Sequence, residues 1–237
     1  MHEQIKFIFG LNNNVDLLSV KKADFLSLVR LIQLAQDPKM TEAVFECQKL
    51  PLENQISKYK KYLESLAEKN PEKFINLNID STSSLEIRPQ HLSNLANCMG
   101  HILRNSFDHG LENSEDRELK NKNPIGQITI KAVESSDGSF ELTIKDDGKG
   151  IQTDRLVQKA VKNNLWSIQK AESASEIEKI NLIFHSGLST NDTVSDTSGR
   201  GVGMDAVKSE VEEKGGTIEI KTKIDIGTEF TLKMSNI

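Results

Sequence analysis

Apolar residues recur with the period of a helix in the first part of the chain. From Val15 to Gln36 they return every three or four positions, which predicts an amphipathic helix. Asp37-Pro38 predicts its end, because a residue before proline is disfavoured in the helical region. A second helical pattern starts near Thr41 and continues at heptad-like spacing, and Pro51 is expected to kink or restart it. We therefore predict an antiparallel helical hairpin over residues 15–70.

The predicted hairpin has a broad apolar surface. Two antiparallel helices cannot cover two such stripes alone, so we expect a second copy of the chain to complete a four-helix bundle. The alternative is that the hairpin packs on the domain that follows it. Residues 1–14 contain Gly10 and the run Asn12 to Asn14, which is a turn or linker signal, and we expect them to form a linker.

After residue 70 the apolar pattern acquires a period of two, which is typical of strands. Strands are predicted at Lys73–Ile79, Gln127–Val133, Phe140–Ile144, Ile218/Ile220 and Phe230/Leu232. Turn residues at 135–138 and 225–227 predict two hairpins. Helical segments before and after separate these hairpins, and each strand has one polar face, which implies a mixed sheet covered by helices on one side only. The sequence predicts an α+β fold, with the helical hairpin followed by an α/β sandwich over residues 71–237.

The helix predicted from about Pro89 to Gly110 has an unusual polar face. Its apolar arc contains Leu92, Leu95, Ala96, Met99, Ile102 and Leu103, and opposite them lie Asn97, His101, Arg104, Asn105 and Asp108. A surface helix would have lysine and glutamate there, whereas these groups coordinate and orient ligands. An asparagine amide oxygen is a hard neutral ligand that suits Mg²⁺, so Asn105 is a candidate magnesium ligand. The alternative is a satisfied polar face packed beneath a loop.

A carboxylate pair and two glycines follow the strand at Phe140–Ile144, in the run Asp146-Asp147-Gly148-Lys149-Gly150-Ile151. Glycines allow the backbone to turn sharply and approach a flat ligand closely. A carboxylate held there can accept a hydrogen bond from an exocyclic amine such as that of adenine, and Asp146 is the better candidate. The alternative is an ordinary strand-ending turn. Thr228, at the start of the last strand, is a candidate to line the same adenine pocket.

The run Ser198 to Asp205 has glycine at every second position and precedes a helix that ends near Lys214. Such a loop predicts a phosphate cradle, because backbone N–H groups and the positive end of the helix dipole face the anion. It is neither a Walker A loop nor the Gly-x-Gly-x-x-Gly loop of dinucleotide-binding proteins. The segment Asn163–Ser198 before it has weak periodicity, so we expect a lid or a disordered segment.

Composition narrows the possible classes of partner and location. The 237 residues are 36% hydrophobic and 27% charged, with a net charge of -5, so no basic field is available to attract nucleic acid or an anionic membrane. Cys47 and Cys98 match no metal-binding spacing, which favours a reduced, cytoplasmic setting. We find no signal peptide and no apolar run of about 18 residues, so no membrane span is expected.

Taken in order, these motifs resemble a known family. A helix with an asparagine, Asp-x-Gly-x-Gly, a segment with Phe184, Gly-x-Gly-x-Gly and then Gly-Thr resemble the ATP-binding domain of the GHKL superfamily of kinases, chaperones and gyrases. Within it, His-x-x-x-Asn with Arg-Asn-Ser-Phe-Asp-His-Gly, Leu-Ile-Phe…Gly-Leu-Ser-Thr and Ser-Gly-Arg-Gly-Val-Gly-Met-Asp-Ala-Val resemble the chemotaxis histidine kinases, the CheA type. The resemblance extends from about Leu50 to Ile237. These motifs together are highly specific, although no single one is.

The resemblance implies roles at the end of the central helix. Asn105 would hold Mg²⁺ between the phosphates. His101 occupies the position where the gyrase and chaperone branches have a glutamate that activates water, and a histidine there suits transfer to another histidine better than hydrolysis. Arg104, Asp108 and His109 would shape the phosphate end of the site. The catalytic residues implied are therefore His101, Arg104 and Asn105.

The resemblance also implies the nucleotide-binding set. Asp146 would bind the adenine amine with help from Gly150 and Thr228, the alternating glycines would wrap the phosphates, and Phe184 would belong to the lid. The full set comprises Asn105, Asp108, His109, Asp146, Gly148, Gly150, Ile151, Phe184, Ser189, Thr190, Gly199, Arg200, Gly201, Val202, Gly203, Met204 and Thr228.

The function implied is that of an ATP- and Mg²⁺-dependent protein-histidine kinase core. It would transfer the γ-phosphoryl group to a histidine on a separate phosphotransfer domain, act upstream of a response regulator, and form a homodimer through residues 15–70. The chemotaxis kinases also have a phosphotransfer domain and a receptor-coupling β-barrel, which this sequence lacks, so we expect either a fragment of a larger kinase or a stand-alone module. The alternatives are a GHKL ATPase, a serine kinase acting on a regulator, or a non-catalytic dimeric scaffold.

Overall fold

The computed structural model describes residues 4–11, 14–35, 37–40, 50–81, 86–87, 89–136, 139–188 and 203–235. The chain divides into two compact units, Met1–Leu50 and Pro51–Ile237. The larger unit therefore begins at Pro51, and not at residue 71 as the sequence pattern predicted. Within the described ranges, no helix combines the length and apolar character needed to cross a membrane.

The smaller unit consists of two strands and a helix, β1 (Gln4–Leu11), β2 (Asn14–Lys21) and α1 (Lys22–Ala35). The strands are antiparallel and Leu11 pairs with Asn14, so a two-residue connection joins them. The prediction of a linker is thus wrong for residues 4–11, and the helix predicted from Val15 begins at Lys22. Antiparallel β-structure therefore lies on both sides of the asparagine run, whose first two residues, 12 and 13, lie outside the described residues.

Helix α3 (Leu52–Glu68) belongs to the larger unit. It begins immediately after Pro51, which confirms the predicted restart. Its heptad-like positions enter the core of that unit, with exposed fractions of at most 1% at Leu52, Ile56 and Leu63. The Tyr59 hydroxyl also donates a hydrogen bond to the carbonyl oxygen of Ala96 in the next helix. The alternative in which the hairpin packs on the following domain therefore holds for α3. The predicted start near Thr41 lies outside the described residues.

A five-stranded mixed sheet forms one layer of the larger unit, in the order β4-β6-β7-β9-β8. Its strands are β4 (Phe74–Ser81), β6 (Ile125–Glu134), β7 (Ser139–Asp146), β8 (Thr217–Lys223) and β9 (Gly227–Ser235). The β4–β6 pair is parallel and the other pairs are antiparallel. All the predicted strands and both predicted hairpins are confirmed, although turn residues 137–138 lie outside the described residues. A second, two-stranded sheet pairs β3 (Leu50–Pro51) with β5 (Glu86–Ile87).

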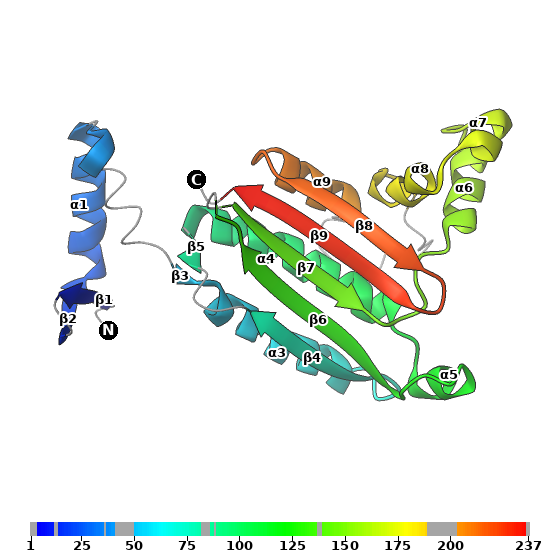
Figure 1. Ribbon diagram of the computed structural model, residues 1–237, viewed down its shortest axis with the longest axis horizontal. Coiled ribbons are helices and arrows are strands. Elements are labelled where there is room, and N and C mark those ends of the chain that lie inside the picture. The colour runs from blue at the N-terminus through cyan, green and yellow to red at the C-terminus, as the bar shows by residue number, and fades with distance from the viewer. Residues whose placement is uncertain are drawn as a thin grey trace. The chain divides into compact units, whose positions relative to one another are not determined.

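Helices α3, α4 (Pro89–Asn105) and α9 (Met204–Glu212) cover one face of the five-stranded sheet (Figure 1). The inward side chains of β6 and β7 alternate with outward ones, and Ile128, Ile130, Leu142 and Ile144 are fully buried. The opposite face is polar, and Asn76 and Asn78 both donate hydrogen bonds to the Gln127 side chain there. Burial of the apolar face therefore fixes α4 and α9 against the sheet, and it confirms the predicted one-sided α/β sandwich.

Short helices occupy much of the segment that we expected to be a lid or disordered. Helices α7 (Ile168–Ser173) and α8 (Glu176–Asn181) and a 3₁₀ turn (Leu182–Phe184) form there, after helix α6 (Thr153–Lys162), which ends just before the segment. Ser167 caps α7, and Ser175 forms a capping box with Glu178 at α8. A small second core gathers Leu156, Ala160, Leu182 and Leu188, with Trp166 packed against it. The expectation of disorder is therefore wrong for residues 163–188, because local capping signals were overlooked, whereas the expectation of a lid stays a prediction.

Candidate nucleotide site

Helix α4 ends in a wide π-helical turn, Ser106–Gly110. The ammonium group of Lys73, just before β4, donates to the carbonyl oxygens of Phe107 at 2.9 Å and Asp108 at 3.2 Å. It also lies 5.4 Å from the centre of the buried Phe107 ring. Such π-turns often occur at functional sites, and this one is fixed by a cation from outside the helix.

Asp146, at the end of β7, is the buried carboxylate that the sequence predicted to bind the base. Its exposed fraction is 2%, and burial raises the pKa of its carboxyl group. The N–H groups of Gly148 and Thr228 donate to Oδ1 at 3.0 and 3.2 Å, and the Ser106 hydroxyl donates to Oδ2 at 3.0 Å. Because Oδ2 receives one of these bonds and Oδ1 two, Oδ2 retains a lone pair that can accept from an amine.

The glycines after Asp146 are required by neighbouring backbone segments. A Cβ atom on Gly148 would lie 2.2 Å from the carbonyl oxygen of Gly110, and one on Gly150 would lie 2.4 Å from that of Lys223. Gly150 also has φ of 72°, a conformation that L residues with side chains rarely adopt. The turn after Asp146 therefore packs tightly between the end of the π-turn and the end of β8.

The glycine loop meets the central helix where α9 begins. Gly203 is the N-cap of α9, and the side-chain nitrogen of Asn105 lies 2.9 Å from the sulfur of the buried Met204. Farther along the same pair of helices, Asn97 donates to Glu210 at 3.3 Å. The predicted asparagine and the start of the predicted phosphate-binding helix are thus adjacent. Four residues of the loop itself, Gly199, Arg200, Gly201 and Val202, lie outside the described residues.

The side chain of Asn105 fits a magnesium ligand. Its amide nitrogen is directed at Met204, and no group among the described residues donates to its amide oxygen. No three His, Cys, Asp or Glu side chains cluster for metal binding in the described part of the chain. An ion held here would therefore take its other ligands from phosphates and water, which is the usual coordination of Mg²⁺ beside a nucleotide.

The remaining polar residues of α4 lie on one side of its last turns. Arg104 forms an ion pair with Asp108 at 3.1 Å, and His101 lies one turn before Asn105 and is partly exposed. Burial lowers the pKa of His109, and the nearby Lys149, Lys73 and Arg104 act in the same direction, whereas Asp108 opposes them. The last turns of α4 and the π-turn therefore contain a guanidinium group and two imidazoles within nine residues of the chain.

Phe184, which was predicted for the lid, and Ile151, which was predicted for nucleotide binding, lie in two different environments. Phe184 is buried in the main core, and Lys208 of α9 lies 5.3 Å from its ring centre. Ile151 packs against the second core, and its N–H donates to Thr222 at 2.8 Å. Ser189 and Thr190 lie outside the described residues. Phe184 therefore packs in the main core, before the segment that leads to the glycine loop.

A buried ion network near Asp146 was missed by the sequence analysis. Arg117 of α5 (Ser114–Leu119) is 1% exposed, and it donates to the Asp147 carboxylate at 2.7 Å and to Glu112 at 3.3 Å. Lys122 donates to Glu112 at 3.0 Å. Burial alone would raise the pKa of Glu112, but hydrogen bonds, foremost from Lys122, hold it below its ordinary value. The charge-rich sequence of residues 112–122 looked like solvated surface, and only the position of Asp147 beside Asp146 hinted at a partner.

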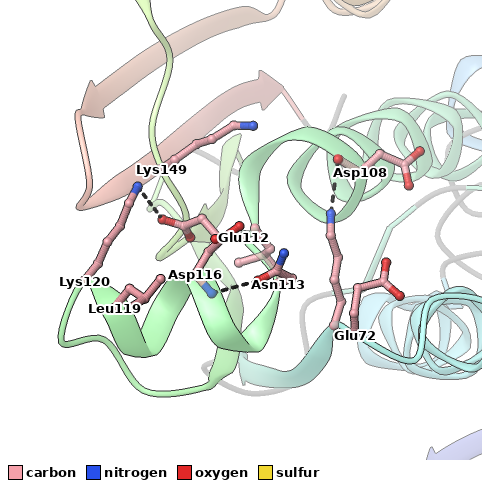
Figure 2. Close-up of a pocket in the computed structure, with 10 residues that line it drawn as sticks. Glu72, Asp108, Glu112, Asn113, Asp116, Leu119, Lys120 and Lys149 are labelled. Carbon is pink, nitrogen blue, oxygen red and sulfur yellow. Dashed lines mark hydrogen bonds and ion pairs between the residues drawn. The ribbon is translucent and has the colours of Figure 1, made fainter.

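A cavity of about 540 Å³ opens beside this network (Figure 2). Most of its lining is charged, and it consists of Glu72, Lys73, Asp108, Leu111, Glu112, Asn113, Asp116, Leu119, Lys120 and Lys149. Neither Asp146 nor Thr228 belongs to this lining. The cavity is therefore separate from the pair predicted to bind adenine.

Similarity to known proteins agrees with this geometry. Residues 92–236 match the family model described as histidine kinase-, DNA gyrase B- and HSP90-like ATPase. The chain is 34% identical over 196 residues to a gliding motility regulatory protein of Myxococcus xanthus, covering 83% of this chain and 25% of that protein. It is 38% identical over 156 residues to chemotaxis protein CheA of Rhizobium meliloti, covering 66% and 20%.

The fold has matches among solved structures as well. The catalytic domain of histidine kinase ThkA superposes with a TM-score of 0.50 at 15% identity, covering 79% of this chain and 94% of that one, which supports the fold alone. The chain spans a quarter or less of the length of the two curated relatives described above. The family match shows that the chain belongs to the histidine kinase-, DNA gyrase B- and HSP90-like ATPase family. Within this family it resembles the CheA-type histidine kinases.

Proposed function

We propose that this chain is the catalytic core of an ATP- and Mg²⁺-dependent protein-histidine kinase. It would transfer the γ-phosphoryl group of ATP to a histidine on a separate phosphotransfer domain, in a pathway that continues to a response regulator. The observation that carries the proposal is the buried Asp146 carboxylate, held by Ser106, Gly148 and Thr228, on the same domain as the Asn105–Met204 contact. Similarity to chemotaxis protein CheA, together with the match to a family model that includes histidine kinases, supports the choice of a kinase.

In this proposal the two ends of the nucleotide meet different groups. The remaining lone pair of Asp146 Oδ2 accepts a hydrogen bond from the exocyclic amine of adenine. The N-terminus of α9 faces the phosphates, where its N–H groups and dipole favour negative charge. Asn105 supplies one oxygen to Mg²⁺, which neutralises phosphate charge when bound. The acceptor for the base thus lies at the end of β7, and the donors for the phosphates lie at the start of α9.

Transfer itself needs little covalent chemistry from the chain. An imidazole nitrogen of the acceptor histidine attacks the γ-phosphorus, a P–N bond forms, and the bond to the bridging oxygen breaks to release ADP. The acceptor ring loses its N–H proton to solvent or to a nearby base. Arg104 lies one turn from His101 and adds positive charge near the phosphates, although Asp108 neutralises part of it. Catalysis by this site would therefore rest on positioning and charge stabilisation.

We also propose that the chain forms a homodimer through α1. Leu28, Leu31 and Leu34 on this helix are 51%, 63% and 70% exposed within the chain. Large apolar side chains spaced three apart on one helix favour burial against a second helix. Because α3 buries its apolar positions in the core of the larger unit, α1 is the better candidate for the contact.

Incubation with γ-labelled ATP, Mg²⁺ and candidate phosphotransfer domains tests the proposed transfer. We expect the label on the acceptor domain to be labile in acid and stable in base, as a phosphohistidine is. A label stable in acid and labile in base would indicate serine, and rapid phosphate release without any acceptor would indicate an ATPase. Binding of ATP without transfer to any candidate domain would count against the kinase.

A further inference from the structure

A single peptide unit connects the buried ion network to the residue that is proposed to bind the base. This unit joins Asp147 to Gly148. Its N–H group donates to Asp146 Oδ1 at 3.0 Å. Its carbonyl oxygen accepts from Lys122 at 2.9 Å and from Arg117 at 3.3 Å. Because a peptide is planar, holding its oxygen also fixes the direction in which its N–H points.

The same two cations fix the surroundings of this peptide. Arg117 donates from its second terminal nitrogen to the Asp147 carboxylate at 2.7 Å, and Lys122 donates to the carbonyl oxygen of Gly148 at 2.7 Å. The other oxygen of Asp147 accepts the N–H of Gln127 in β6 at 2.9 Å. Asp147 and Gly148 are thus held from the α5 side and from the sheet. Arg117 and Lys122 are 1% and 14% exposed, so little water competes for these bonds.

We propose that Arg117 and Lys122 are positioning residues for base recognition, because they hold the Asp147–Gly148 peptide so that its N–H orients the Asp146 carboxylate toward the purine amine. This inference rests on the proposed function, since it assigns to Asp146 the 6-amino group of ATP. Among the bonds of the described residues, those of the two cations in this turn go to Asp147 and Gly148 and not to Asp146. Their loss should therefore weaken discrimination between bases and leave the binding of phosphates largely unchanged.

Lys120 provides a matched control. It lies two residues from Lys122, and it also contacts the Glu112 carboxylate, at 3.4 Å compared with 3.0 Å for Lys122. Its other partner is Asp225, and no bond from Lys120 to the Asp147–Gly148 peptide occurs within the described residues. Lys120→Met and Lys122→Met therefore remove the same charge from the same segment, but only the second releases the peptide.

The experiment compares the calorimetric affinity for ATP with that for inosine triphosphate, which has a 6-oxo group in place of the 6-amino group. Wild type and Lys120→Met should prefer ATP by the same ratio within about twofold, and Lys122→Met should lower this ratio about fivefold to tenfold. Lys122→Gln, which retains a donor, should recover part of the preference. A general loss of stability would weaken the binding of both nucleotides alike, and it would leave the ratio of the two affinities unchanged.

Arg117→Lys provides an independent test in case Lys122→Met does not fold. It keeps a buried positive charge beside Glu112 and Asp147, but it lacks the fork that reaches both the carboxylate and the carbonyl of Asp147. Its preference for ATP should also fall. If Lys122→Met and Arg117→Lys are folded by circular dichroism and keep the wild-type ratio, the inference is overturned. If wild type shows no preference between the two nucleotides, the inference also fails, whereas failure of wild type to bind any nucleotide removes the proposed function itself.

Discussion

The side-chain nitrogen of Asn105, the last residue of α4, lies 2.9 Å from the sulfur of Met204, the first residue of α9. This contact joins two segments that are far apart in the chain, the end of the central helix and the helix that follows the glycine loop. It also occupies the amide nitrogen, while no group among the described residues donates to the amide oxygen. The proposed magnesium ligand is thus oriented before nucleotide arrives.

Replacement of Asn105 by alanine tests its role in handling Mg²⁺. Phosphoryl transfer by Asn105→Ala should fall on the order of a hundredfold, because charge stabilisation in the transition state is lost. Affinity for adenosine, which has no phosphates, should change little, since Asp146 is untouched. Turnover measured alongside adenosine titration checks both statements. Equal losses in the two assays would instead indicate a structural role for this side chain.

Replacement of Asp146 by asparagine should separate base recognition from folding. The new amide oxygen can still accept from Gly148 and Thr228, and the new NH₂ group can donate to the Ser106 hydroxyl, which can rotate to accept. We therefore expect a folded variant. Its affinity for ATP should fall at least about tenfold, because the NH₂ group would face the donor of the purine amine. Calorimetry and a melting curve check the two parts.

The same variant makes a prediction about pH. Burial raises the pKa of Asp146 in the folded protein, so ionisation of this carboxyl group lowers the stability of the fold. This cost is absent at a pH below the pKa of Asp146 in the unfolded chain, and it is complete at a pH above the raised pKa in the folded protein. Asp146→Asn removes this cost. Its melting temperature relative to wild type should be highest near neutral pH and should decline as the pH falls through the raised pKa. A difference that stays constant with pH would contradict this account.

Much of the larger unit could be predicted because its signals are local. The strands alternate with period two, and the residues around Asp146 and Asn105 belong to short motifs whose chemistry can be inferred from residue type. Strand β2 was mistaken for helix because Leu18 fits the helical stripe that continues through Phe25 and Val29 of α1. The bond from Ser106 to Asp146 was missed, because nothing in the sequence indicates that residues 40 positions apart meet.

The largest omission of the sequence analysis was the buried network of charged residues near Asp146. Arg117, Lys120 and Lys122 lie in a segment whose composition predicts an exposed surface, and their partners include Asp147, which is 30 positions from Arg117. A buried arginine is recognised only when its carboxylates are seen beside it. Ser167 and Ser175, by contrast, were recoverable, since a serine before a short helical pattern is a capping signal.

Trp166, the only tryptophan, reports on the second core. Its ring packs against this core together with Ile151, which follows the Asp146–Gly150 turn, and Lys170 lies 5.6 Å from its centre. Binding of ATP with Mg²⁺ should therefore change its fluorescence intensity or emission maximum. A spectrum that stays the same at saturating nucleotide would show that the second core does not respond to the site.

The proposed dimer depends on the apolar surface of α1. Leu28→Lys combined with Leu31→Lys should convert a dimer into a monomer, because two charges cannot be buried in an apolar contact without a large cost. Analytical ultracentrifugation of both forms measures the change. Affinity for ATP should be the same in the two, since α1 belongs to the smaller unit. A wild-type chain that is already monomeric at high concentration would contradict the proposal.

Titration calorimetry of the purified, folded chain with ATP, in the presence and absence of Mg²⁺, tests the central claim most directly. The account predicts saturable binding of one nucleotide per chain, tighter when Mg²⁺ is present and weakened in Asp146→Asn. Absence of any heat of binding in both conditions, from protein with a cooperative melting transition, would contradict it.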